Sequence, residues 1–106
     1  MTTPTHLLIH RYRPGTGPQP GTLEHDHEMQ RWEDVDRTLR EQGALIGSFA
    51  LNDAQRLVGP ATHDAGDELL FAVHAISVAD CDQAVQLAES MPTADYGSIE
   101  VRPLMP

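Results

Sequence analysis

The sequence predicts an α+β fold in which four antiparallel strands form one sheet and two helices cover one of its faces. A chain of 106 residues is long enough for a single hydrophobic core but not for two independent ones. Four segments carry the residue types and alternation typical of strands, and two carry apolar residues at spacings of three and four. These segments follow one another as strand, helix, strand, strand, helix, strand. We therefore expect one domain over residues 1–106, with one site.

The first segment, HLLIHRY over residues 6–12, is rich in strand-forming residues and predicts a strand. Alternation places His6, Leu8, His10 and Tyr12 on one face of it. Residues 13–22 follow; the stretch from Pro14 to Gly21 contains three prolines and three glycines, which can be neither helix nor inner strand. We expect this Pro/Gly segment to be a flexible loop unless something covers it.

A helix is predicted over residues 23–42. Met29, Trp32, Val35 and Leu39 recur at helical spacing, and Thr22 is a suitable N-cap. Acidic residues in the first turn stabilise a helix, because their negative charge lies near the positive end of its dipole. Gly43 is a typical C-terminal signal.

The second half of the chain predicts three more strands and a helix. Residues 44–51 form a strand, and a polar connection follows in which residues 56–59 (RLVG) form a short additional strand. The apolar run of residues 69–78 predicts a buried central strand. Residues 79–91 form a helix that Pro92 stops, and residues 98–104 form the last main strand. This order is that of the ferredoxin-like fold.

The predicted central strand, LLFAVHAISV, is apolar on both faces. Two helices cover only one face of such a sheet, and a large apolar surface is unfavourable in water. We therefore expect a homodimer whose sheets pack face to face around a barrel-like space, that is, a dimeric α/β barrel.

Charge and composition exclude several classes of function. The net charge is −9, and the seven basic residues are scattered arginines, so nucleic acid is not an expected partner. No apolar run is long enough to span a membrane, and the first residues do not resemble a secretory signal, so we expect a cytoplasmic protein without a membrane partner. The single cysteine, Cys81, cannot form an internal disulfide and lies among acidic residues, which disfavour a reactive thiol.

Three stretches together resemble the YCII-related proteins, in particular the branch named for a DGPF motif. YGSIEVRPLM at residues 96–105 is similar to the closing strand of that family. LREQGALIGSFAL at residues 39–51 is similar to the end of its first helix and its second strand. VADCDQAVQLAESMP, at residues 78–92, fits the start of its second helix. The resemblance implies a ferredoxin-like fold and a homodimer.

The chain also departs from that family. The DGPF segment is absent, because residues 62–68 read THDAGDE. Catalytic members are associated with a helical histidine and an aspartate in an Asp-Pro turn. Here those positions fall on Trp32 and on Met91-Pro92, and Asp95 is the nearest acidic residue beyond the turn. The resemblance therefore implies the fold and the dimer more than it implies a reaction.

The stretch LEHDHEMQRWEDVD, residues 23–36, contains candidates for both metal binding and acid/base catalysis. His25 and His27 point in nearly opposite directions on a helix, so we expect no metal there. On the same helix, His25, Met29, Trp32 and Asp36 form one stripe. In one interpretation His25 and Asp36 are catalytic while Met29 and Trp32 contact a ligand. In the other, Met29 and Trp32 belong to the core and the two polar residues border it.

A second cluster comes from the strands. The first and third strands of a ferredoxin-like sheet are neighbours, so we expect His10 and His74 to lie side by side. His6 and Tyr12 share their face. One interpretation is a pocket, on the face toward the dimer space, in which His10 and His74 are catalytic and His6 and Tyr12 bind a ligand. The other is a set of interface histidines that only satisfy hydrogen bonds.

We expect, as a first hypothesis, that the protein binds a small aromatic or polyketide-like metabolite between the first helix and the sheet. Because histidines are dense on predicted inward faces and phosphate-loop and nucleophile-elbow motifs are absent, the chemistry would be cofactor-free proton transfer of the isomerase, lyase or cyclase type. The alternative is a non-catalytic accessory or structural dimer with a filled interior.

Overall fold

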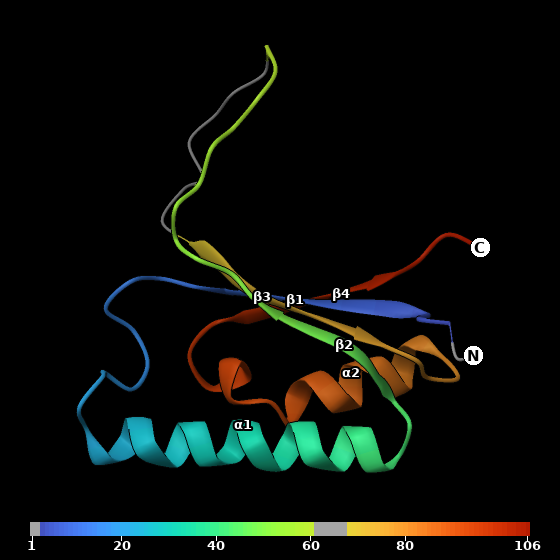
Figure 1. Cartoon of the computed structure of the whole chain (residues 1–106), viewed down its shortest axis with the longest axis horizontal. Helices are drawn as coiled ribbons and strands as arrows, with labels where there is room; N and C mark the ends of the chain where they lie inside the picture. The colour runs from blue at the N-terminus through green and yellow to red at the C-terminus, as the bar shows by residue number, and fades with distance from the viewer. Residues whose placement is uncertain (1–2, 61–67) are drawn as a thin grey trace.

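The computed structural model describes residues 3–60 and 68–106, and it confirms the predicted order of the main elements. The sheet order is β2-β3-β1-β4 with all pairs antiparallel, as expected for a ferredoxin-like fold. Both α-helices lie on the same side of this sheet (Figure 1). The elements are β1 (His6–Tyr12), α1 (Leu23–Glu41), β2 (Leu45–Ala50), β3 (Leu69–Ile76), α2 (Cys81–Glu89), the short 3₁₀ helix η1 (Pro92–Asp95) and β4 (Ser98–Pro103).

Both α-helices begin at side-chain caps that the sequence provides. The Thr22 hydroxyl accepts a hydrogen bond from the His25 backbone N–H, and Asp80 accepts one from Gln83. Helix α1 is followed by Gly43 at φ +72°, a conformation that glycine adopts without strain. The second helix is shorter than predicted because the chain turns at Met91 into η1, which the sequence analysis did not anticipate.

The core lies between the sheet and the two helices. Leu8 and Ile76 from the sheet are completely buried, and Leu39 is the one buried residue of α1. Helix α2 presents Ala84 and Ala88 to the core. The predicted alternation along β1 is confirmed, since His6, Leu8 and His10 are all buried. This face lies under the helices and not in a dimer space, which corrects the interpretation that its histidines lie at an interface.

A β-bulge in β3 redirects one aromatic side chain. His10 pairs with Ala72 and Arg11 pairs with Leu70, so Phe71 has no partner residue on β1. Such a bulge changes the direction of side chains relative to regular alternation. The Phe71 ring consequently lies against His10 and Tyr12, at centroid distances of 5.9 and 5.1 Å. It thereby becomes a wall of the site described below.

The opposite face of the sheet has no helix over it (Figure 1). Ile9 and Val73 pair across its centre, and Phe49 pairs with Val73 from the other side. Phe49 is 58% exposed. Glu100 on β4 borders this apolar centre and pairs with Arg11 at 2.6 Å.

The connection after β2 differs from the prediction. Residues 56–59, expected as a short strand, form no strand, because their backbone finds no ladder partner among residues 3–60 and 68–106. They belong to an arm that projects from the sheet (Figure 1). The segment where the DGPF motif is missing falls almost wholly at residues 61–67, outside the described residues. Within the described ranges, neither helix has the length and apolarity needed to cross a membrane.

Candidate functional site

The site is built around two buried histidines on neighbouring strands. His10 on β1 and His74 on β3 are 0% and 3% exposed. His74 Nδ1 lies 2.9 Å from His10 Nε2, so one ring donates a hydrogen bond to the other. The predicted adjacency of these two side chains is confirmed, and it follows from the pairing of β1 with β3.

Thr93, which the sequence analysis missed, completes the inner end of this chain. Its Oγ1 lies 3.0 Å from His10 Nδ1, and Thr93 is fully buried in η1. Gly97 lets this segment approach β1 closely, because a Cβ there would collide with the Arg11 carbonyl oxygen. A buried threonine after a proline gives no sequence signal of this role. Only the turn between α2 and β4 brings it beneath His10.

The outer end of the chain faces α1. His74 Nε2 lies 3.4 Å from Asp36 Oδ1 and 3.4 Å from the Ser48 hydroxyl. Asp36 Oδ1 is buried, yet it has no partner in hydrogen-bonding geometry among the described residues. The contact with His74 is therefore an electrostatic one, and the carboxylate oxygen keeps its capacity to accept a proton.

Aromatic rings fix the orientation of the two imidazoles. Trp32 stacks nearly parallel to His74, with an interplanar angle of 9° and a centroid distance of 5.6 Å. The same indole meets His10 edge-on at 5.5 Å. Trp32 thus contacts both histidines without supplying a titratable group.

Burial keeps both histidines neutral at physiological pH. It lowers the pKa of His10 to about 3, and repulsion from His74 when that ring is protonated acts in the same direction. Burial also lowers the pKa of His74, although the Asp36 carboxylate opposes that shift. A neutral imidazole carries one N–H and one acceptor nitrogen, so the two rings and Thr93 form a directional chain.

Two proton arrangements satisfy this chain. In the first, Thr93 donates to His10 Nδ1, His10 Nε2 donates to His74 Nδ1, and the His74 Nε2–H points outward. In the second, each of these groups donates in the opposite direction and His74 Nε2 presents a lone pair. Because Asp36 Oδ1 lies 3.4 Å from that nitrogen, an ionised carboxylate favours the first arrangement. His74 is then a proton donor at the cavity wall.

A cavity of about 280 Å³ lies on this outer side of His74, between α1 and the sheet. This volume lies just below the roughly 300–1,000 Å³ range of ligand sites. Most of its wall is apolar, and three of its polar side chains, Asp36, Ser48 and His74, lie close together. Its lining consists of Glu28, Met29, Trp32, Asp36, Ser48, Ala50, Phe71, Ala72 and His74.

The predicted stripe on α1 divides between two cavities. Met29, Trp32 and Asp36 line the first, whereas His25 lies one turn earlier and lines a second cavity of about 310 Å³ together with Tyr12. His6 shares the helix-covered face but lines neither cavity, and its Nδ1 lies 2.9 Å from Thr5 Oγ1. The structure thus brings together His10, His74 and Asp36 and leaves His25 and His6 apart from them. Asp95 also lies outside the first cavity and forms an exposed ion pair with Arg31.

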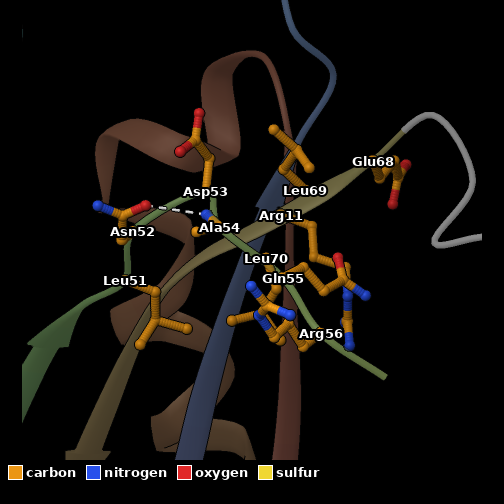
Figure 2. A pocket seen from close by; sticks show the side chains of 10 residues that line it. All are labelled: Arg11, Leu51, Asn52, Asp53, Ala54, Gln55, Arg56, Glu68, Leu69 and Leu70. Atoms are coloured by element: carbon orange, nitrogen blue, oxygen red, sulfur yellow. Dashed lines mark hydrogen bonds between the residues drawn. The ribbon is translucent and has the colours of Figure 1, made fainter. Parts of the chain in front are cut away.

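A larger hollow, of about 600 Å³, lies elsewhere, where the arm leaves β2 (Figure 2). Figure 2 shows Asn52 bonded to the Ala54 backbone N–H, with Arg11 and Arg56 nearby. The arm residues of its wall are exposed, and Arg11 is already paired with Glu100. Its described lining residues include no histidine, so we place the candidate site at His74. Among residues 3–60 and 68–106, no group of three histidine, cysteine or acidic side chains is placed to hold a metal ion.

Comparisons with known proteins give one family model and a solved structure of similar shape. The family model described as YCII-related domain matches residues 5–106. The solved structure is 5-chloro-2-hydroxyhydroquinone dehydrochlorinase from Burkholderia phenoliruptrix, in complex with 2,5-dihydroxybenzoquinone. It shares 13% identity, covers 94% of this chain and 93% of its own, and has a TM-score of 0.49. No curated protein matches the chain.

Proposed function

Because this chain belongs to the YCII-related domain family and holds a neutral histidine beside a half-buried carboxylate, we propose that it catalyses cofactor-free proton transfer on a small ring compound. The observation that carries the proposal is the pair formed by His74 Nε2 and Asp36 Oδ1, 3.4 Å apart on one cavity wall. A neutral donor next to a proton acceptor is the arrangement that general acid/base catalysis requires.

The two groups have complementary roles in this proposal. The His74 Nε2–H donates a hydrogen bond to a carbonyl oxygen of the ligand and stabilises the negative charge that develops there. The Asp36 carboxylate, whose side chain is 31% exposed, removes a proton from the adjacent carbon, and the electron pair of that C–H bond moves into the enolate. The enolate is the shared intermediate of isomerisation, of elimination from the neighbouring carbon and of cyclisation, so one site serves each of these reaction types.

The cavity favours a planar ring as the substrate. Trp32 and Phe71 supply aromatic surface to its lining, and Ala72 is a small lining residue. The polar groups Asp36, Ser48 and His74 lie together. A ligand whose oxygen substituents are all on one side can therefore direct them at these groups and keep its apolar side against the rest of the wall. Aromatic or polyketide-like compounds with a carbonyl beside an acidic C–H have this character.

The direct test follows deuterium exchange in D₂O with a panel of six-membered ring ketones. We expect wild-type protein to exchange the carbon-bound proton next to the carbonyl faster than buffer does. We also expect the ligand to shift the indole N–H resonance of Trp32, the single tryptophan of the chain. If no compound of the panel gives either exchange or a shift of the Trp32 resonance, the proposal is wrong. The alternative, a non-catalytic accessory or structural dimer, is then supported.

Thr93→Val should slow this exchange about 3- to 10-fold. The substitution keeps the side-chain shape but removes the hydroxyl that holds His10 Nδ1, and one such hydrogen bond contributes about 1 kcal/mol. Nitrogen-15 NMR of the imidazoles should show altered His10 and His74 signals. Thr93→Ser retains a hydroxyl and should restore both signals and most of the rate. Unchanged imidazole signals in Thr93→Val would contradict the positioning role.

We further propose that the protein is a homodimer whose subunits meet through the open face of the sheet. The support is the apolar centre formed by Ile9, Phe49 and Val73, which no helix covers. Two such faces packed together would bury Phe49, which is 58% exposed in the single chain.

Phe49→Glu is expected to convert this dimer to a monomer, because each subunit would bury an unpaired carboxylate in an apolar contact. Light scattering coupled to size-exclusion chromatography measures the mass. Val85→Glu is the matched control, since Val85 is 39% exposed on α2 in the other layer. The Val85→Glu variant should have the same molecular mass in solution as the wild-type dimer. A monomeric wild type, or equal behaviour of the two variants, would refute this interface.

A further inference from the structure

The second cavity, of about 310 Å³, lies next to the catalytic one and shares two of its walls. Glu28 and Phe71 line both cavities. Since the Phe71 ring is placed there by the β3 bulge, a single feature of the sheet shapes both spaces. A ligand that occupies both cavities has to pass beside Glu28 and the ring of Phe71, which separate them.

Aromatic rings and prolines dominate the wall of the second cavity. Tyr12 meets Phe71 edge-on at 5.1 Å and Tyr96 edge-on at 6.5 Å, so three rings converge from β1, β3 and the segment before β4. Three prolines of the loop between β1 and α1 close another side: Pro14, Pro18 and Pro20. Flat apolar surfaces of this kind suit the faces and edges of a second aromatic ring.

The loop is held against these rings by close contact. A Cβ on Gly17 would lie 2.7 Å from the Tyr96 ring, and Gly17 adopts φ +77°. Gln19 donates a hydrogen bond to the Gly17 carbonyl oxygen at 3.0 Å and so bridges the loop internally. The loop predicted to be flexible unless covered therefore has defined contacts that build one side of the cavity.

The polar groups of this cavity select the charge and the hydrogen bonds of its occupant. His25 Nδ1 is buried and has no hydrogen-bond partner among the described residues. Tyr96 donates its hydroxyl to Glu28 Oε1 at 3.2 Å, and burial beside that carboxylate raises the pKa of Tyr96 to about 12. An anionic substituent would meet the Glu28 carboxylate, whereas a neutral hydroxyl can pair with His25.

From the shared walls, the converging rings and the unpaired nitrogen of His25, we infer that the ligand carries a second, aromatic ring besides the ring on which the proton transfer takes place. One ring lies beside His74, and the second lies against Tyr12, Tyr96 and the prolines with a neutral hydroxyl directed at His25. This inference rests on the proposed function for the position of the first ring. It specifies that the substrate has two rings and is neutral at the second ring, and it assigns His25 to binding and not to catalysis.

The test compares three neutral probes by calorimetry: phenol, para-phenylphenol, and a biphenyl with a hydroxyl on each ring. Affinity should rise at least 10-fold from phenol to para-phenylphenol and again by about 5- to 10-fold with the second hydroxyl, the gain from one hydrogen bond. In NMR spectra, phenol should shift the Trp32 indole N–H alone. The two-ring probes should also shift the backbone amide of Gly15, which lines the second cavity.

His25→Leu should remove the gain from the second hydroxyl and leave para-phenylphenol binding unchanged. Tyr96→Leu should reduce the gain from the second ring, and circular dichroism establishes that both variants are folded. His27→Leu, an exposed histidine on the same helix, is the matched control and should bind like wild type.

The outcomes separate the two proposals. Binding of phenol at Trp32 without a gain from the second ring would overturn the two-ring inference and leave the proposed function intact. Failure of all three probes to bind would overturn both the two-ring inference and the proposed function. A gain that survives in His25→Leu and in Tyr96→Leu would place the second ring elsewhere and would also overturn the inference.

Discussion

Asp36→Asn is expected to slow deuterium exchange into a bound ring ketone by about 10²- to 10⁴-fold, the usual contribution of a general base. The asparagine side chain has almost the same shape as the carboxylate it replaces, but its amide cannot take up a proton. Since Asp36 Oδ1 makes no hydrogen bond among the described residues, the substitution breaks no such contact of that atom. The free energy of unfolding should therefore change little, and the rate should change greatly.

Asp34→Asn provides the matched control. Asp34 lies two residues earlier on α1, its side chain is 49% exposed, and it pairs with Arg37 at the surface. An equal loss of rate in both variants would indicate a general effect of helix charge, and the base would then have to be another group. Exchange should be measured at several ligand concentrations, because loss of the base lowers kcat and leaves KM nearly unchanged.

Substitutions of His74 separate the donor role from the base role. His74→Phe removes the Nε2–H and should also slow exchange by about 10²-fold or more, since one well-placed donor is worth about that much. His74→Gln keeps an N–H group near the same position and should recover part of this loss. If the glutamine variant is as slow as the phenylalanine variant, His74 acts by transferring a proton and not by donating a hydrogen bond.

The central pair of the site could be predicted because it depends on strand periodicity. Alternation places His10 on the same face as Leu8, and the ferredoxin-like order makes β1 and β3 neighbours. The apolar stripe of α1 likewise placed Trp32 and Asp36 toward the sheet. These inferences use only regular geometry, which the sequence pattern specifies directly.

The remaining contacts depend on irregular backbone. The bulge that turns Phe71 toward the helices has no signal in LLFAVHAI, and Thr93 reaches His10 only because η1 follows α2 closely. Ser48 lies opposite His74 after a second register shift, between Leu45 and Gly47 in β2. Helical periodicity correctly placed His25 on the face of α1 that carries Trp32 and Asp36. It did not predict that His25 lines a different cavity from theirs, because the side chain of Glu28 and the ring of Phe71 lie between the two spaces.

Acidification is expected to destabilise the protein well above the pH at which carboxylates usually protonate. A histidine in the unfolded chain binds a proton near pH 6.5, whereas burial lowers the pKa of His10 to about 3 in the folded state. Above pH 6.5 both states are neutral and the stabilisation is fully present. As pH falls below 6.5 the unfolded state gains a proton that the folded state excludes, so stability declines down to about pH 3.

The expected loss from His10 alone is about 2.5 kcal/mol between pH 6 and pH 4. The lowered pKa of His74 adds to it in the same direction. Urea unfolding at a series of pH values measures this loss. His10→Leu lowers stability at pH 7.5 because His74 Nδ1 loses its partner, but its stability should fall less steeply with pH.

The informative quantity is therefore the slope and not the absolute stability. His27→Leu removes an exposed histidine of α1 and should keep the wild-type slope. Carboxylates such as Glu100, whose pKa the arginine contacts lower, contribute equally in all three proteins and cancel in the comparison. Parallel curves for wild type and His10→Leu would mean that His10 accepts a proton in the folded state. In that case the neutral hydrogen-bonded chain from Thr93 to His74 would not describe the resting site.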